Sequence, residues 1–372
     1  MDPAGPAGSL PPELWLHIYR LATSESSPLA VANADRFQYL SFPDPFKDIK
    51  HYLRDAYSFV LVCKSWNTLA NEILYENIQI RVDRPFQVVQ LCTSLKRRPD
   101  TARLVRSILL SPTGFDVNYT FLSLCPRLQL VVQPDASNSD TRMLVTGPDL
   151  EEEEEEMVDG GYLTAAVLLR NNISPLPQFH SLKHIYWTES SFSSLLLRKL
   201  VRLTPNLEYL FLTQSSTIRE LVENDFPALP SVRRLGLVST GGLLTYSVFK
   251  LDLHNLTRFQ CSPSYLHLEE LPTLPLLRTL ELFGSRSSIP FDIIFSRFPR
   301  LQELCYDVWN GLTGVQNPCD AMPLSCIRLH SAVSVIRDWT PVEGHFAMFV
   351  SPGFPRNTAA RVARKLVPCR WH

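Results

Sequence analysis

The stretch Leu207-Glu208-Tyr209-Leu210-Phe211-Leu212 decides the fold, because its pattern recurs along the C-terminal part of the chain. Apolar residues stand first, fourth and sixth in the order L-x-x-L-x-L. The copies are Leu182/Ile185/Trp187, Leu207/Leu210/Leu212, Val232/Leu235/Leu237, Leu256/Phe259/Cys261, Leu277/Leu280/Leu282, Leu301/Leu304/Tyr306 and Leu324/Ile327/Leu329. Their first members are 25, 25, 24, 21, 24 and 23 residues apart. This near-constant spacing indicates a repeated structural unit, although a leucine-rich α/β domain could show it by accident.

A period of about 20 to 29 residues is typical of leucine-rich repeats. Helical stretches such as 192–201 and 289–295 separate the triads, so each strand is expected to return through a helix to a parallel neighbour. An earlier copy is found at Val105/Ile108/Leu110, Leu128 opens a degenerate one, and residues 78–82 form a candidate leading strand. The predicted fold class is α/β, with an irregular leucine-rich-repeat-like solenoid and a parallel sheet.

Two amphipathic segments lie near the N-terminus, at residues 10–18 and 60–70. The first begins with two prolines, which suit the opening turn of a helix because that turn makes no use of an amide proton. Three apolar residues, Leu14, Ile18 and Leu21, then recur at helical spacing. The second segment carries an equivalent stripe, made of Val62, Trp66, Leu69 and Ile73. Both segments are therefore predicted to be helices with one apolar face.

In this order the two segments resemble an F-box of the fungal type, whose pattern runs LPxE-L-xxI and then VC-xxW-xxL-A. The F-box is a small helical module that docks on the Skp-type adaptor of a cullin-RING (SCF) ubiquitin ligase. The resemblance assigns adaptor binding to Leu10, Pro11, Leu14, Ile18, Val62, Cys63, Trp66 and Leu69. Residues 23–55 replace the usual short link and are interpreted as an inserted loop. Two helices that simply pack on their own protein are the alternative.

The expected domain organisation follows from these segments and from the charge distribution. The parts are a disordered leader 1–9, an F-box 10–81 with the inserted loop 23–55, first degenerate repeats 82–148, an acidic disordered loop 149–161, a leucine-rich-repeat-like solenoid 162–350 and a basic C-terminal tail 351–372. The run Glu151 to Glu156 repels itself and cannot enter a core. It is either a mobile loop or a docking strip for a basic partner.

Side chains alternate along a strand, so the residues two, four and six places after each first member are expected to face away from the core. These positions, which we call the strand face, include six candidate target-binding residues: Tyr186, Tyr209, Phe211, Arg234, Arg258 and Glu281. Exposed Tyr, Phe and Arg are enriched at binding hot spots. The alternative is an ordinary surface, or one that a loop covers.

Composition and charge exclude several classes of protein. A 372-residue chain with 45% hydrophobic residues can bury a large core, and a net charge of −1 gives no global field for nucleic acid or membrane. No apolar run approaches the roughly 18 residues of a membrane span, and the first residues do not resemble a signal peptide. A cytoplasmic or nuclear location is therefore expected, with neither nucleic acid nor membrane as a partner.

No catalytic or metal-binding motif is evident. The eight cysteines form no C-x-x-C pair and are interpreted as buried thiols, and the nine histidines are scattered singly. Phosphate-binding loops, nucleophile elbows and zinc-protease helices are absent from the sequence. We therefore expect a binding protein without cofactor or enzymatic activity, although a site dispersed over the sequence would escape this search.

Together these features predict the substrate-recognition subunit of an SCF-type ligase, in which the F-box binds the Skp-type adaptor and cullin-RING core. The repeats would bind an unknown protein substrate. The alternative function is a non-ligase leucine-rich-repeat scaffold that binds another protein partner.

Overall fold

The computed structural model describes residues 11–23, 57–61, 64–80, 84–111, 115–134, 175–188, 194–213, 229–238, 253–261, 273–282, 291–307 and 326–330. Contacts divide these residues into two compact units, one ending at Asn206 and one beginning at Leu207. The predicted array 162–350 has residues in both units. The leader 1–9, the inserted loop apart from Thr23, the acidic loop 149–161 and the tail 351–372 lie outside the described residues.

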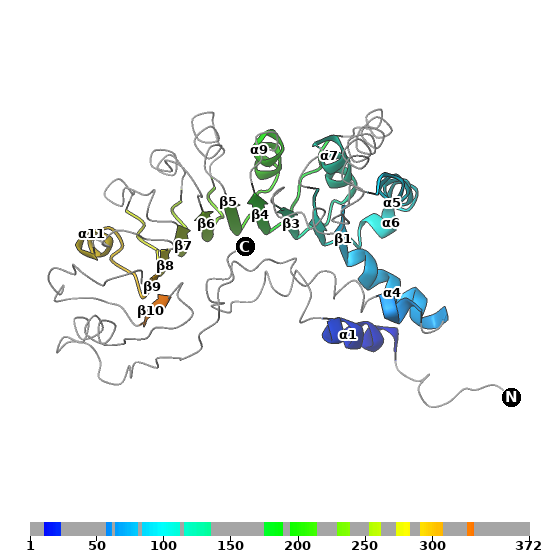
Figure 1. Cartoon of the computed structure of the whole chain (residues 1–372), viewed down its shortest axis with the longest axis horizontal. Coiled ribbons are helices and arrows are strands. Elements are labelled where there is room, and N and C mark those ends of the chain that lie inside the picture. The colour runs from blue at the N-terminus through cyan, green and yellow to red at the C-terminus, as the bar shows by residue number, and fades with distance from the viewer. Residues whose placement is uncertain are drawn as a thin grey trace, which may run out of the picture. The chain divides into compact units, whose positions relative to one another are not determined.

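The first unit begins with two helices packed against each other, α1 (Pro12–Thr23) and α4 (Lys64–Glu76) (Figure 1). Their shared core is centred on Tyr19 and Ile73, each about 1% exposed. Around this pair pack the partly buried side chains of Trp15, Leu16, Phe59 and Leu74. The Tyr19 ring stacks on Phe59 with 4.8 Å between ring centroids. One face of each helix is thus used for internal packing.

Four parallel strands follow in sequence order: β1 (Asn77–Gln79), β2 (Ser107–Leu109), β3 (Leu130–Gln133) and β4 (His184–Thr188). After α1 and α4, the unit continues with the helices α5 (Pro85–Arg97), α6 (Pro99–Ala102), α7 (Phe115–Leu124) and α9 (Ser194–Arg202). A proline opens both α5 and α6, where its missing amide proton costs nothing. Figure 1 shows α5, α7 and α9 on the same side of the strands.

The second unit contains six parallel strands: β5 (Tyr209–Thr213), β6 (Arg234–Val238), β7 (Arg258–Cys261), β8 (Thr279–Leu282), β9 (Glu303–Asp307) and β10 (Cys326–His330). Helix α11 (Phe291–Arg297) lies between β8 and β9 in the sequence. The middle triad members, from Leu210 on β5 to Ile327 on β10, stand opposite one another on neighbouring strands. The α/β class with parallel strands at the repeat positions is confirmed.

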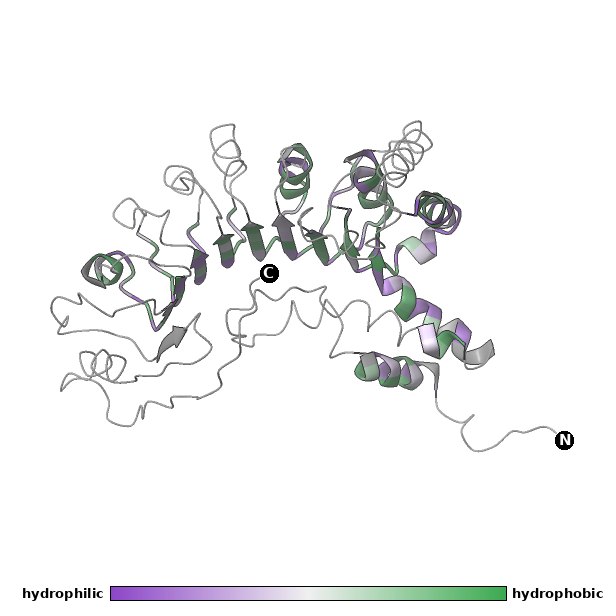
Figure 2. Ribbon diagram, viewed as in Figure 1, coloured by the Kyte–Doolittle hydropathy of each residue, from purple (hydrophilic) through white to green (hydrophobic). Residues whose placement is uncertain are grey.

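The triad residues form the core of the strands. First members from Val105 and Leu128 to Leu301 are at most 1% exposed, and Figure 2 shows green, apolar residues along the strands. A turn precedes most strands, in which the first member's N–H donates to the carbonyl three residues earlier. These donor and acceptor pairs are Leu182/Phe179, Val232/Leu229, Leu256/Leu253, Leu277/Leu274 and Leu301/Phe298. These acceptor residues are also buried, so each of these five repeats places a fourth apolar side chain in the core.

Gly236 on β6 stands opposite Phe211 on β5. A Cβ atom at position 236 would lie 2.2 Å from Cδ2 and 2.8 Å from Cε2 of the Phe211 ring. Glycine here therefore allows the aromatic ring to lie directly over the neighbouring strand.

We predict that Gly236→Ala destabilises the protein by about 1–3 kcal/mol, because the added methyl group forces the Phe211 ring out of place. Without the clash, the same change would stabilise the strand by reducing the entropy of the unfolded chain. Urea unfolding of the wild type and the variant measures this change in the free energy of unfolding. In the Phe211→Ala background the cost of Gly236→Ala should fall to near zero. An equal cost in both backgrounds would contradict this explanation.

Candidate functional site

The outer face of α1 carries an exposed apolar stripe. Leu14, Ile18 and Leu21 are 48%, 42% and 60% exposed, and their i, i+4, i+7 spacing places them on one side of the helix. Trp15 and Tyr19 occupy the opposite, internal side. We call Leu14, Ile18 and Leu21 the docking stripe, because exposed apolar residues on a helix whose other side is already packed mark a candidate interaction surface.

The structure describes only some of the other residues that the F-box resemblance assigns to adaptor binding. Pro11 is exposed at the start of α1, and its carbonyl accepts hydrogen bonds from the N–H groups of Leu14 and Trp15 at 3.0 and 3.3 Å. Trp66 and Leu69 lie in α4. Leu10, Val62 and Cys63 lie outside the described residues. Their part in adaptor binding stays a prediction.

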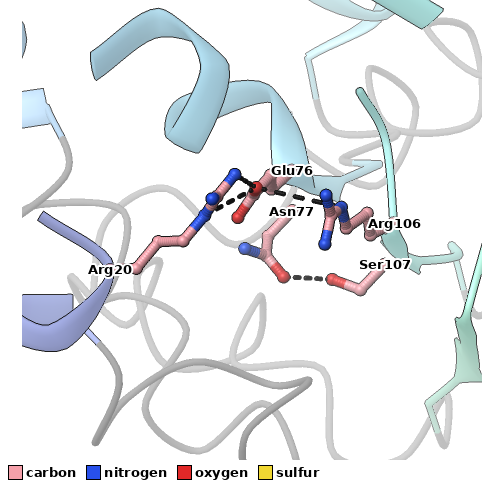
Figure 3. Close-up of polar contacts among 5 residues, drawn as sticks. All are labelled: Arg20, Glu76, Asn77, Arg106 and Ser107. Carbon is pink, nitrogen blue, oxygen red and sulfur yellow. Dashed lines mark hydrogen bonds and ion pairs between the residues drawn. The ribbon is translucent and has the colours of Figure 1, made fainter. Parts of the chain in front are cut away.

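A cluster of polar contacts among Glu76, Arg20 and Arg106, which we call the Glu76 joint, connects these helices to the first strands (Figure 3). Glu76, the last residue of α4, is 8% exposed, and its Oε1 accepts hydrogen bonds from Nε and Nη2 of Arg20 at 3.1 and 2.5 Å. The Nε atom of Arg106 lies 3.8 Å from the same oxygen, and the Arg106 N–H donates to the Glu76 carbonyl. Beside this contact, the Ser107 hydroxyl donates to Oδ1 of Asn77. One carboxylate thus ties α1 and α4 to the start of β2.

We predict that Glu76→Gln lowers the free energy of unfolding by about 1–2 kcal/mol, since it removes the charge that both arginines share. The effect is limited because the Arg20 and Arg106 side chains are 42% and 45% exposed, so water replaces part of the lost contact. Urea unfolding at two salt concentrations measures this change in the free energy of unfolding.

The matched control for Glu76→Gln is Asp100→Asn, which removes an ion pair with Arg103 at 3.3 Å from a carboxylate that is 97% exposed. This control should change stability by less than about 0.5 kcal/mol. Equal effects of the two substitutions would show that the joint contributes no more than a surface ion pair.

The strand face is less exposed than the sequence predicted. Tyr209, Arg234 and Arg258 are partly exposed, whereas Tyr186, Phe211 and Glu281 are only 7%, 5% and 6% exposed. The expectation of exposure is therefore wrong for these last three. The role of all six residues in target binding stays a prediction.

Cross-strand contacts explain this burial. The Phe211 ring covers Gly236 and lies 6.4 Å from the Tyr209 ring, measured between centroids. Glu281 accepts hydrogen bonds from Nε of Arg258, at 2.7 Å, and from its Nη2. The sheet brings Arg234 between these two pairs, opposite Tyr209 on one side and Arg258 on the other. The second unit thus places five of the six predicted target-binding residues on neighbouring strands, and Tyr186 lies in the first unit.

The buried thiols are unsuited to nucleophilic or metal chemistry. Cys92, Cys125, Cys261 and Cys305 are buried, and burial raises the pKa of Cys125 to about 12 and raises that of Cys261 as well. The Cys125 and Cys261 thiols are therefore protonated at neutral pH, whereas thiolates are the reactive and ligating species. Within the part of the chain that the structure describes, no three His, Cys, Asp or Glu side chains are grouped as metal ligands would be. No described helix combines the length and apolar character needed to cross a membrane.

No model of a known protein family matches this chain, and no curated protein matches it. The sequence did not predict three features of these sites. They are the Glu76 joint, the contact between Phe211 and Gly236, and the exposure of Arg233 and Arg278 just before β6 and β8. A glycine at a strand position signals close approach and could have predicted the second feature. The joint has no local signal, because Arg20 and Glu76 are 56 residues apart.

Proposed function

We propose that this chain is the substrate-recognition subunit of an SCF-type cullin-RING ubiquitin ligase. The observation that carries the proposal is the docking stripe, since Leu14, Ile18 and Leu21 remain exposed on a helix whose other face is already packed. Leu14 and Ile18 are also the positions that the F-box resemblance assigns to the Skp-type adaptor. In this proposal α1 and α4 belong to an F-box, and the parallel strands belong to leucine-rich-repeat-like units.

The proposed mechanism is proximity, without a chemical step on this chain. The docking stripe holds the adaptor, and the strand face, with Tyr209, Arg234 and Arg258 partly exposed, holds the target. Tethering raises the effective concentration of the ubiquitin-loaded enzyme near lysines of the target. The Glu76 joint contributes by keeping the adaptor-binding helices in a fixed position on the first strands of their unit.

Replacing Leu14 and Ile18 together by Asp is predicted to weaken binding of a purified Skp-type adaptor at least about thirtyfold, because the loss of even one hot-spot residue costs roughly 2 kcal/mol or more. Calorimetry with the purified chain measures this affinity. The melting temperature should stay close to that of the wild type, because both side chains are exposed in the free chain.

Leu195→Asp is the matched control, because Leu195 is an exposed leucine of α9, 53% accessible, outside the docking stripe. It should bind the adaptor with wild-type affinity. A wild-type chain that does not bind the adaptor would contradict the ligase proposal and favour a scaffold for another partner. Wild-type affinity in the double variant would exclude the docking stripe as the binding site.

A further inference from the structure

Both faces of the sheet are buried in the first unit. The face that carries the triads holds Ile108, Val131 and Ile185, each 0% exposed. On the strand face, side chains from all four strands β1 to β4 are at most 7% exposed. They are Asn77, Ser107, Leu109, Leu130, Val132, His184 and Tyr186. Strand pairing sets them in two rows, one that runs from Asn77 to His184 and one that runs from Leu109 to Tyr186.

The strand face of the second unit is more open. Two places after the first triad member, its side chains are partly exposed at Tyr209, Arg234, Arg258 and Thr279. Leu130 and His184 occupy the same position in their repeats and are buried. Neighbouring strands flank such a side chain but do not lie above it, because side chains stand perpendicular to the sheet. A leucine with 0% exposure and a tyrosine with 7% therefore require a further layer over the strand face of β1 to β4.

The described helices do not form this layer. Helices α5, α7 and α9 lie together on one side of the strands, so they cover one face only (Figure 1). That face is the one with the triads, since the triads stay buried in both units whereas the strand face is partly open in the second. Helix α4 packs on α1, on α6 and on the adjoining β1, and neither α1 nor α4 makes an extensive contact with β3 or β4.

Chain topology limits which other part of the chain can supply the layer. Strand order follows chain order, so right-handed crossovers between consecutive strands all run over the same face, that of the helices. This rule assigns residues 135–174, between β3 and β4, to the helix side. The longer stretches that are not crossovers are residues 1–10, the inserted loop 23–55 and residues 331–372.

The inserted loop suits the strand face of β1 to β4 best. It leaves α1 at Thr23 and returns just before Phe59, whose ring stacks on Tyr19, so both of its ends are held in the first unit and closure costs little entropy. Residues 331–372 instead follow β10 of the second unit. Strands about 4.8 Å apart and about 3.3 Å of extended chain per residue mean that roughly 10 residues cross four strands and return. The loop exceeds this length about threefold.

The composition of the inserted loop also matches a buried layer. Leu109, Val132 and Tyr186 form an apolar row that needs apolar partners above it. Residues 1–10 supply few large apolar side chains, whereas the loop supplies Leu29, Val31, Phe37, Leu40, Phe42, Phe46, Ile49 and Leu53. In the second row, Nδ2 of Asn77 is buried and makes no hydrogen bond within the described residues. It is therefore a donor suited to a main-chain carbonyl of a covering segment.

We propose that the inserted loop 23–55 packs across the strand face of β1 to β4 and joins the α1 and α4 helices to the sheet of their unit. A consequence, which rests on the proposed function, is that target binding is left to the strand face of the second unit. There Tyr209, Arg234 and Arg258 are partly exposed, whereas Tyr186 serves internal packing.

The first test is photo-cross-linking from the covered face of the full chain. Tyr186→p-benzoylphenylalanine keeps an aromatic side chain at this position, and mass spectrometry identifies the residues that it links to after irradiation. We expect links to residues 23–55. The matched control is Phe86→p-benzoylphenylalanine, because Phe86 is a 77% exposed aromatic residue of α5, on the helix side of the same unit. It should give no links to the inserted loop.

The second test measures access to the strand face with Val132→Cys. Alkylation at position 132 by N-ethylmaleimide, read by mass spectrometry, should become at least about tenfold faster when a Gly-Ser linker of equal length replaces residues 23–55. The same replacement of residues 340–372 should leave the rate unchanged. Cys125, which is 0% exposed in the same unit, serves as the internal control for unfolding and should stay unreactive throughout.

Links from position 186 only to residues 331–372, to residues 135–174 or to a second molecule would overturn the proposal, as would the absence of links. An unchanged alkylation rate at position 132 without the loop would also overturn it. Faster alkylation of Cys125 as well would show that the linker variant is unfolded, and the cross-links then decide. Neither assay contains the adaptor, so both results are independent of whether the adaptor binds α1.

Discussion

Apolar side chains at matching positions of neighbouring parallel strands hold each unit of this protein together. The three apolar residues of each copy from Leu182/Ile185/Trp187 to Leu301/Leu304/Tyr306 enter the core, and the turn before several strands adds a further apolar side chain such as Phe179 or Phe298. Each fully buried side chain of this kind contributes about 1.5–3 kcal/mol, so one strand with its turn cannot bury enough surface to fold alone. The strand face depends on this register, because the register decides which side chains point away from the core.

Core packing also decides which residues form the two candidate binding surfaces. On α1, the internal core takes Trp15 and Tyr19, whereas the docking stripe stays exposed. On the strands, alternation leaves Arg234 and Arg258 side by side on the face opposite to the triads. Both surfaces thus consist of residues that the cores do not use, and in the proposed function each surface holds a different protein.

The parts of the structure with a regular period could be predicted from the sequence. The triads predicted the strands because their spacing repeats, and Leu14, Ile18 and Leu21 predicted α1 because helical neighbours recur every three or four residues. Burial on the strand face could not be predicted, since it depends on which side chain the next strand places opposite. Phe211 is buried because residue 236 is glycine, and Glu281 because Arg258 reaches it across the sheet. Such pairings join residues that are more than twenty positions apart.

Hydrogen exchange of the full chain, with and without a saturating Skp-type adaptor, tests adaptor binding by α1 directly. We expect a stable complex in which amides of α1 and α4 exchange more slowly, because the adaptor covers the docking stripe and suppresses local opening of these helices. Amides of β6, β7 and β8 should exchange at unchanged rates. The absence of a complex, or protection confined to those strands, would contradict it.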